Sequence, residues 1–128
     1  EQTVKNDNKE KPRQAKSNNI DELTAAEVVV PYVKQHKRLP DYYITKKEAR
    51  RQGWNPAKGN LCDVLPGRVI GGDVFSNREG RLPVANGRRW FEADLNYQCG
   101  NRNADRLLFS NDGLVFITTD HYKNFTRQ

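Results

Sequence analysis

Three short segments in the last third of the chain carry side chains that exchange protons and bind anions. Glu92 stands in the segment WFEAD, Arg102 and Arg106 in RNADR, and His121 in TTDHY. A carboxylate can accept a proton, an imidazolium can donate one, and two guanidinium groups can hold a phosphate between them. Together these are the groups that cleavage of an RNA phosphodiester requires when no metal takes part.

The chemistry expected of Glu92 and His121 follows from the structure of RNA. The 2′-hydroxyl lies next to the phosphodiester, so a base needs only to deprotonate it while an acid protonates the leaving 5′-oxygen. The product is a 2′,3′-cyclic phosphate, which water opens in a slower second step. Base and acid each contribute about 10²–10⁴-fold. Alternatively, Glu92 is a solvated strand carboxylate and His121 an ordinary surface histidine.

Three cations are candidates for binding the reacting phosphate. Arginine matches phosphate oxygens with its planar fork and stays charged, which suits Arg102 and Arg106. A salt bridge to Asp94 or Asp105 is the structural alternative, and we expect it for one arginine in addition to phosphate contact. Lys46 follows a predicted helix cap, where free N–H groups already favour anions. Without that context it would be a surface lysine.

The charge balance also favours an anionic partner. The 128 residues contain 22 Lys+Arg against 16 Asp+Glu, a formal net charge of +6. Such an excess favours nucleic acid, an anionic membrane surface or an acidic protein. The sequence lacks the run of roughly 18 apolar residues that a membrane helix needs. Cys62 and Cys99 show no C-x-x-C spacing, so a metal site is not indicated.

The chain is predicted to form one domain, residues 20–128, behind a flexible polar tail, residues 1–19. It opens EQTVK without an apolar signal segment. Either the protein stays inside the cell or a signal peptide has been removed, and an even number of cysteines favours the second. We therefore expect a secreted, extracellular protein.

The expected elements are short helices followed by short strands. Thr24 to Glu27 and Thr45 to Glu48 are typical capping boxes, and Asn60 is predicted to cap a third helix through Val64. Pro31 should kink the first of these helices, and Gly53 should end the second. Strands are expected over 69–75, 89–95, 106–109, 114–118 and 124–126, with Asp112-Gly113 as a hairpin turn. This order predicts an α+β fold, with N-terminal helices packed on a C-terminal antiparallel sheet of about five strands.

Three motifs in this order resemble those of the barnase family. They are LPDYYITK at 39–46, GGDVFSNREG at 71–80 and TTDHY at 118–122, and the resemblance extends from about Ile20 to the end. Members are small, secreted bacterial ribonucleases that prefer guanosine. The resemblance implies the barnase-like fold and cleavage of single-stranded RNA 3′ of guanosine, with no cofactor or metal.

The resemblance also assigns roles to individual residues. It makes Glu92 the general base and His121 the general acid, with Lys46, Arg102 and Arg106 around the phosphate and Asp73 beside Lys46. The substrate-binding residues it implies are Asp73, Phe75, Ser76, Asn77, Arg78, Glu79 and Tyr122. Backbone N–H groups of the 76–79 loop would meet guanine O6, and Glu79 would accept N1–H and N2–H. Structurally, this segment is also a polar hairpin loop closed at Gly80.

Departures from the family pattern concern three places. Asn101 replaces an aromatic residue before the first active-site arginine, and Pro31 lies within the first helix. Cys62 and Cys99 are both additions. If bonded, they close a loop of about 37 residues and contribute about 3–4 kcal/mol through loop entropy. Free buried thiols are the alternative, and we expect the disulfide.

The sequence also allows other functions. The same fold could serve as a toxin domain delivered to competing bacteria, or as a non-catalytic RNA-binding module, which would need neither Glu92 nor His121. A membrane-active basic protein would need an amphipathic basic helix, which the sequence does not show. The family resemblance also implies a small acidic barstar-like inhibitor protein as a partner. We expect a monomer.

Overall fold

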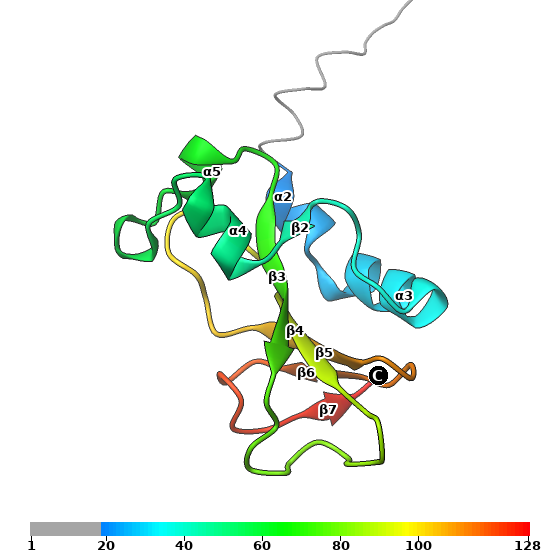
Figure 1. Cartoon of the computed structure of the whole chain (residues 1–128). Coiled ribbons are helices and arrows are strands. Elements are labelled where there is room, and N and C mark those ends of the chain that lie inside the picture. Colours follow the sequence, from blue (N-terminus) through cyan, green and yellow to red (C-terminus); the bar gives the residue numbers. More distant parts are fainter. Residues whose placement is uncertain (1–18) are drawn as a thin grey trace, which may run out of the picture.

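The computed structural model describes residues 19–128, so the predicted tail lies outside the described residues except for Asn19. Helices precede the larger part of a six-stranded sheet, as Figure 1 shows. The α+β prediction is therefore confirmed. The helices are α2 (Ile20–Leu23), α3 (Ala26–His36), α4 (Lys46–Arg51), the 3₁₀ turn η1 (Pro56–Lys58) and α5 (Leu61–Val64). The strands are β2 (Tyr43–Ile44), β3 (Val69–Phe75), β4 (Trp90–Asp94), β5 (Arg106–Ser110), β6 (Val115–Thr118) and β7 (Thr126–Arg127).

The strands are joined in the order β2-β3-β4-β5-β6-β7. From β3 to β7 every pair is antiparallel, and Gly113 takes a φ of +101° in the predicted turn between β5 and β6. The sequence prediction missed β2, which pairs in parallel with the start of β3. A strand of two residues is too short to show alternation, and only its tertiary partner makes it a strand.

The first predicted capping box is wrong. Thr24 is fully buried and lies between α2 and α3, where its hydroxyl donates to the carbonyl of Ile20 at 2.8 Å and accepts from Tyr97 N at 2.9 Å. Ala25 occupies the N-cap of α3 and makes no side-chain cap bond. Thr24 therefore connects the helices to the turn after β4 instead. Helix α3 continues through Pro31, whose ring is exposed.

The two later helix starts are in the predicted places. The Thr45 hydroxyl caps α4 by accepting from Glu48 N, and Gly53, with φ +111°, follows its C-cap. Asn60 does precede α5 but makes no side-chain cap bond there. Its amide instead holds the preceding loop, accepting from Asn55 N at 2.7 Å and donating to Gly53 O at 3.2 Å. Helix α4 matters most here because Lys46 is its first residue.

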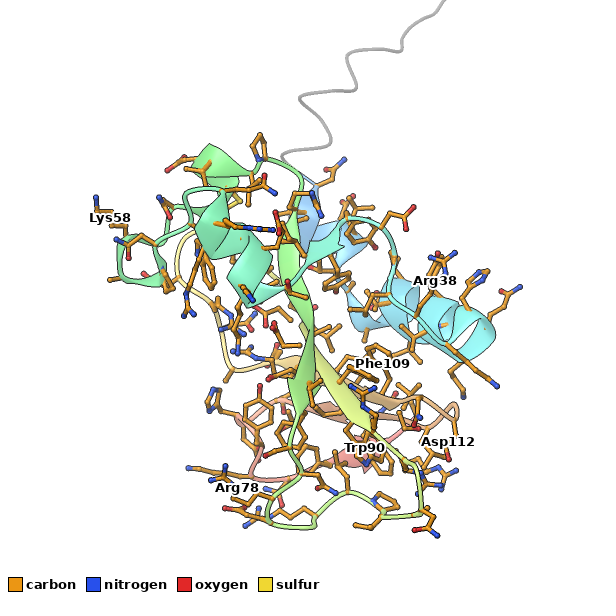
Figure 2. All side chains as sticks on the ribbon, viewed as in Figure 1. Arg38, Lys58, Arg78, Trp90, Phe109 and Asp112 are labelled. Atoms are coloured by element: carbon orange, nitrogen blue, oxygen red, sulfur yellow. A yellow bond between two sulfur atoms is a disulfide. The ribbon has the colours of Figure 1, made fainter. Side chains whose placement is uncertain are left out.

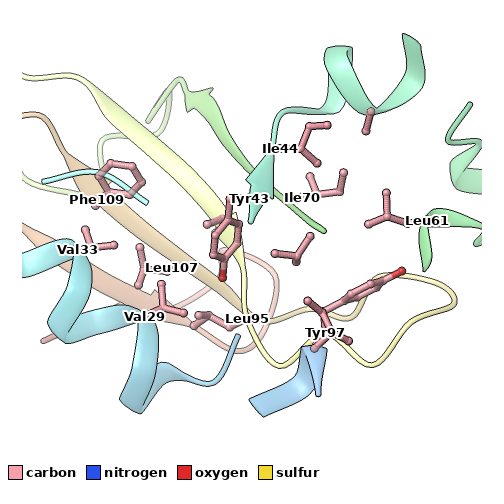
Figure 3. Packing of buried hydrophobic residues seen from close by; sticks show 14 of the residues in the cluster. Val29, Val33, Tyr43, Ile44, Leu61, Ile70, Leu95, Tyr97, Leu107 and Phe109 are labelled. Atoms are coloured by element: carbon pink, nitrogen blue, oxygen red, sulfur yellow. The ribbon is translucent and has the colours of Figure 1, made fainter. Parts of the chain in front are cut away.

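Two apolar clusters lie on the two faces of the sheet. The larger one joins α2 and α3 to the sheet and continues to α5, as Figure 3 shows from Val29 to Leu61. The smaller one contains Leu82, Trp90 and Leu108 and packs against Tyr122. Successive side chains of a strand point to opposite faces, so Phe91 joins the larger cluster while Glu92 lies on the other face. Among the described residues no helix is long and apolar enough to cross a membrane.

Candidate active site

Glu92 lies in the middle strand of the site, opposite Asp73 of β3 and Leu108 of β5. One carboxylate oxygen accepts a hydrogen bond from the Tyr122 hydroxyl, and the other lies 3.7 Å from the Lys46 ammonium. The carboxylate is only 13% exposed, so few water molecules compete for its charge. Glu92 is 46 positions from Lys46 and 30 positions from Tyr122, and the latter two are 76 positions apart. Only the tertiary structure brings these three residues together.

Tyr122 connects this carboxylate to the base-recognition loop and to His121. Its ring stacks on Phe75 with centroids 5.2 Å apart, and it makes a T-shaped contact with the His121 ring, with centroids 4.7 Å apart. Burial, followed by the hydrogen bond to Glu92 and the charge of that carboxylate, raises the pKa of Tyr122 well above its usual value. The phenol therefore stays protonated at working pH and remains a donor to Glu92.

His121 is held in a tight loop after β6. Its φ is +56°, and its backbone N–H donates to Ala104 O at 3.2 Å. The ring itself is exposed, as a group that protonates a leaving oxygen must be. The structure places His121 beside Tyr122 and therefore at the edge of the Glu92 site. The two proposed proton-transfer groups lie on one side of the sheet.

Asp120, which the sequence prediction did not include, fixes this loop. Its carboxylate accepts from the Thr118 hydroxyl at 2.8 Å, from Asn124 N at 2.9 Å and from Asn124 Nδ2 at 2.7 Å. These hydrogen bonds lower the pKa of Asp120 far below its usual value, and the bond from the Asn124 side chain contributes most. A short Asp side chain that bonds nearby backbone N–H groups is typical of turns. The presence of an Asp directly before His121 could therefore have predicted this role from the sequence.

Arg102 and Arg106 converge on one buried carboxylate. Arg102 makes a two-pronged pair with Asp94, at 2.7 and 2.8 Å, and Arg106 Nε lies 3.2 Å from the same group. Both arginines therefore use Asp94, where a salt bridge was expected for one. The Arg102 side chain is 23% exposed and that of Arg106 only 3%. The hydrogen bonds to Asp94 also raise the pKa of Arg102, so its positive charge is permanent.

Asp73 and Lys46 are neighbours, but through the main chain. Asp73 Oδ2 accepts from Lys46 N at 3.1 Å, at the first turn of α4. The Lys46 side chain is then directed to Glu92. Asp73 thus fixes the first residue of α4 through its main chain, and the Lys46 ammonium remains free to approach Glu92.

The predicted base-recognition loop lines a cavity of about 380 Å³ beside Tyr122. Asn77, with φ +51°, closes the loop by bonding both the N–H and the carbonyl of Leu82 through its side chain. Glu79 is exposed and pairs with Arg81 at 3.4 Å. All of the predicted loop residues line this cavity: Phe75, Ser76, Asn77, Arg78 and Glu79. Arg81 and Phe125 complete it, and neither was predicted.

The predicted disulfide is present between Cys62 and Cys99. It joins α5 to the turn between β4 and β5, three residues before Arg102. Asn101 in this turn donates from its side chain to Pro56 O at 3.5 Å. The turn that carries Arg102 is thus attached to the helical layer by a covalent bond and a polar contact. Among residues 19–128 no group of three or more His, Cys, Asp and Glu side chains is arranged to hold a metal ion.

Known ribonucleases are similar in sequence to this chain. The model of a protein family described as ribonuclease matches residues 26–128. The chain belongs to this barnase-like ribonuclease family. Within the family, it is 63% identical over 99 residues to ribonucleases of Bacillus intermedius and Bacillus pumilus, and 62% identical over 99 residues to a ribonuclease of Heyndrickxia coagulans. The matched region covers 77% of this chain in each case.

The relatives differ in length from the chain. The match covers 91% of the Heyndrickxia coagulans ribonuclease but only 61% of each Bacillus ribonuclease. The family membership that was predicted from three motifs is confirmed.

Proposed function

We propose that the chain is a metal-independent endoribonuclease that cleaves single-stranded RNA on the 3′ side of guanosine. The observation that carries this proposal is the position of Tyr122, which donates a hydrogen bond to Glu92 and contacts the His121 ring. Tyr122 therefore links the proposed base to the proposed acid, and the Lys46 ammonium lies 3.7 Å from the carboxylate. Membership of a ribonuclease family supports the same activity.

The reaction uses the two groups in sequence. Glu92 takes the proton from the 2′-hydroxyl, the 2′-oxygen attacks phosphorus, and the bond from phosphorus to the 5′-oxygen breaks. His121 gives its proton to that leaving oxygen, and a 2′,3′-cyclic phosphate remains. In the slower second step the roles are exchanged: His121 activates water and Glu92 returns its proton to the 2′-oxygen.

The cations stabilise charge on the phosphate as the bonds change. The Lys46 and Arg102 side chains are partly exposed, at 31% and 23%. Arg106 is buried and contributes by its charge and by its pair with Asp94. Donors fixed in position before reaction cost little reorganisation in the transition state, which is why such groups accelerate phosphoryl chemistry.

Guanosine preference follows from the cavity beside Tyr122. The base would enter between Phe75 and the 76–79 loop, where Glu79 can accept from both guanine donors. Adenine has no N1–H and cannot supply both donors to Glu79, and a hydrogen bond to a charged group is worth about 1.5–3 kcal/mol. Arg81 pairs with Glu79 at 3.4 Å and lines the same cavity.

The proposal is tested with oligonucleotides that contain one guanosine. They should be cut 3′ of it in the presence of EDTA, and mass spectrometry should find a cyclic phosphate on the 5′ fragment. Replacing that guanosine by deoxyguanosine should abolish cleavage because the nucleophile is absent. Activity that disappears on chelation, or that survives the deoxy substitution, would refute the mechanism.

Secretion and an inhibitor partner belong to the same proposal. The Cys62–Cys99 disulfide supports an oxidising compartment. An active ribonuclease endangers the RNA of its producer, and the cations around Glu92 offer a site for a small acidic barstar-like inhibitor protein. Its binding should weaken as salt rises because charge complementarity is screened. An affinity that does not depend on salt would contradict this form of recognition.

A further inference from the structure

A groove of about 490 Å³ lies on the face of the sheet that faces away from Glu92. Its aromatic wall comes from neighbouring strands, because Phe91 of β4 is the register partner of Phe109 of β5, with ring centroids 5.4 Å apart. Phe109 is almost fully buried, while Phe91 is partly exposed. Phe91 and Glu92 are consecutive, so the two side chains leave β4 on opposite faces. The groove is therefore separate from the active site.

Cations surround this aromatic wall. Lys37 and Arg38 line the groove from the end of α3, and the Arg89 guanidinium lies over the Phe91 ring at 5.4 Å from its centroid. Figure 2 shows Arg38 beside α3 and Phe109 next to it on the sheet. The Arg38 side chain is 60% exposed, and its pair with Asp41, at 3.5 Å, is weak because Asp41 is 98% exposed. Three cations against one carboxylate leave the rim positive.

The groove is open because of a glycine and an unpaired strand edge. A side chain at Gly72 would reach Leu39 at 3.9 Å and Thr45 at 3.5 Å, so its absence leaves room above the strand. Strand β2 ends opposite Ile70, and from Gly71 onward β3 has no strand neighbour on that side among the described residues. Because Thr45 directly precedes Lys46, this end of the groove lies next to the active-site cation. A nucleic-acid strand leaving Lys46 can pass this edge and enter the groove.

We propose that the groove binds a distal segment of the single-stranded RNA whose cleavage is proposed above, with a base against Phe91 and phosphates at Lys37, Arg38 and Arg89. A positive groove with an aromatic surface is the general device for holding single strands without reading sequence. The proposal rests on the proposed function only in taking RNA as the natural ligand.

The test uses 2′-O-methyl oligonucleotides, which no enzyme acting through the 2′-hydroxyl can cleave. Fluorescence anisotropy would compare a strand of about twelve nucleotides with a guanosine-containing trinucleotide, which cannot span both sites. The variants are Arg38→Gln and, as a matched control that removes one charge elsewhere, Lys58→Gln. Lys58 is exposed in the loop of η1, at the opposite end of the helical layer from Arg38 (Figure 2).

Arg38→Gln should weaken binding of the long strand by about threefold to tenfold, and should reduce the slope of log affinity against log salt by about 0.7, the value for one phosphate contact on a single strand. Trinucleotide binding should stay unchanged. Lys58→Gln should change neither. Equal long-strand affinities for the two variants would overturn the proposal, as would an equal loss for both strand lengths. Because the strands are not cleaved, these results stand apart from the EDTA test of catalysis.

Discussion

The Tyr122 hydroxyl, in the loop after β6, donates a hydrogen bond to a carboxylate oxygen of Glu92 in β4. The two residues are 30 positions apart in the sequence. The raised pKa of Tyr122 keeps this donor protonated, and the ring of the same residue contacts Phe75 and His121. One side chain therefore aligns the proposed base, contacts the proposed acid and forms part of the proposed guanine cavity. The hydroxyl of Tyr122 should therefore matter for catalysis, and its ring for base binding.

Tyr122→Phe removes the donor but keeps the ring against Phe75. Hydrogen bonds to charged groups are worth about 1.5–3 kcal/mol, so kcat should fall by about tenfold or more because Glu92 loses its orientation. KM for a guanosine dinucleotide should change little, since stacking remains. Steady-state kinetics and the thermal unfolding midpoint would be measured together. A loss that appears mainly in KM would show that the hydroxyl serves binding and not alignment.

Glu92→Gln keeps the size of the side chain and removes the proton acceptor. We expect kcat to fall by about 10²–10⁴-fold, the usual contribution of a general base. Binding of an uncleavable 2′-O-methyl oligonucleotide should remain within a few-fold of the unmodified protein. Glu27→Gln, at an exposed position in α3, is the matched control. Normal turnover in Glu92→Gln would remove this residue from the base role.

The sequence predicts elements well where local signals agree with tertiary structure. Thr45 does cap α4, because its hydroxyl meets a free N–H one turn later whatever surrounds it. Thr24 shows the same local pattern and fails, because its buried hydroxyl finds partners in α2 and at Tyr97. Local propensity was overridden by a tertiary contact 73 residues away. The two-residue β2 was missed for a related reason, since only β3 defines it.

For the site, the sequence indicated residue types but not their arrangement. The even number of cysteines in a chain expected to be secreted predicted the Cys62–Cys99 disulfide, and the structure contains it. The sequence did not reveal that Asp94 serves both arginines, or that Asp73 binds the main chain of Lys46. Spacing along a chain cannot show which of several acids lies next to a cation. Those choices depend on strand register and on the start of α4.

Asp120 should make the stability of the His121 loop depend on pH. Its folded-state pKa is lowered, so its carboxylate stabilises the fold fully above the ordinary value of 3.8. This contribution should decline as the pH falls from 3.8 towards the lowered folded-state pKa. Asp120→Asn should therefore destabilise the protein at pH 6 and much less near pH 2, as measured by urea unfolding. A constant difference across this range would contradict the linkage.

Removal of the disulfide should destabilise the protein through the unfolded state. The bonded residues are 37 positions apart, which corresponds to about 3–4 kcal/mol of loop-closure entropy. The free energy of unfolding of the double variant Cys62→Ala/Cys99→Ala, measured with urea, should be lower by that amount. Reductant should lower the free energy of unfolding of the unmodified protein towards that of the double variant, and should leave the double variant unchanged. Equal stabilities of the oxidised protein and the variant would show that strain cancels the entropy.

Glu79→Gln tests base recognition without touching the proton-transfer groups. The amide oxygen can still accept one guanine donor, but the charge is lost and the amide nitrogen faces the second donor. The ratio of kcat/KM for guanosine over adenosine dinucleotides should fall by about 10-fold or more, as expected from 1–3 kcal/mol for an unmet hydrogen bond. The adenosine substrate should be cut at an unchanged rate or slightly faster.

The control for this experiment is Arg81→Gln. Arg81 pairs with Glu79 at 3.4 Å and lines the same cavity, yet it offers no acceptor for guanine N1–H. Its substitution should lower kcat/KM for both dinucleotides in similar proportion and leave their ratio nearly unchanged. If instead Arg81→Gln erased the preference while Glu79→Gln kept it, the cationic side chain would be the specificity determinant, and guanine O6 would be the group it reads.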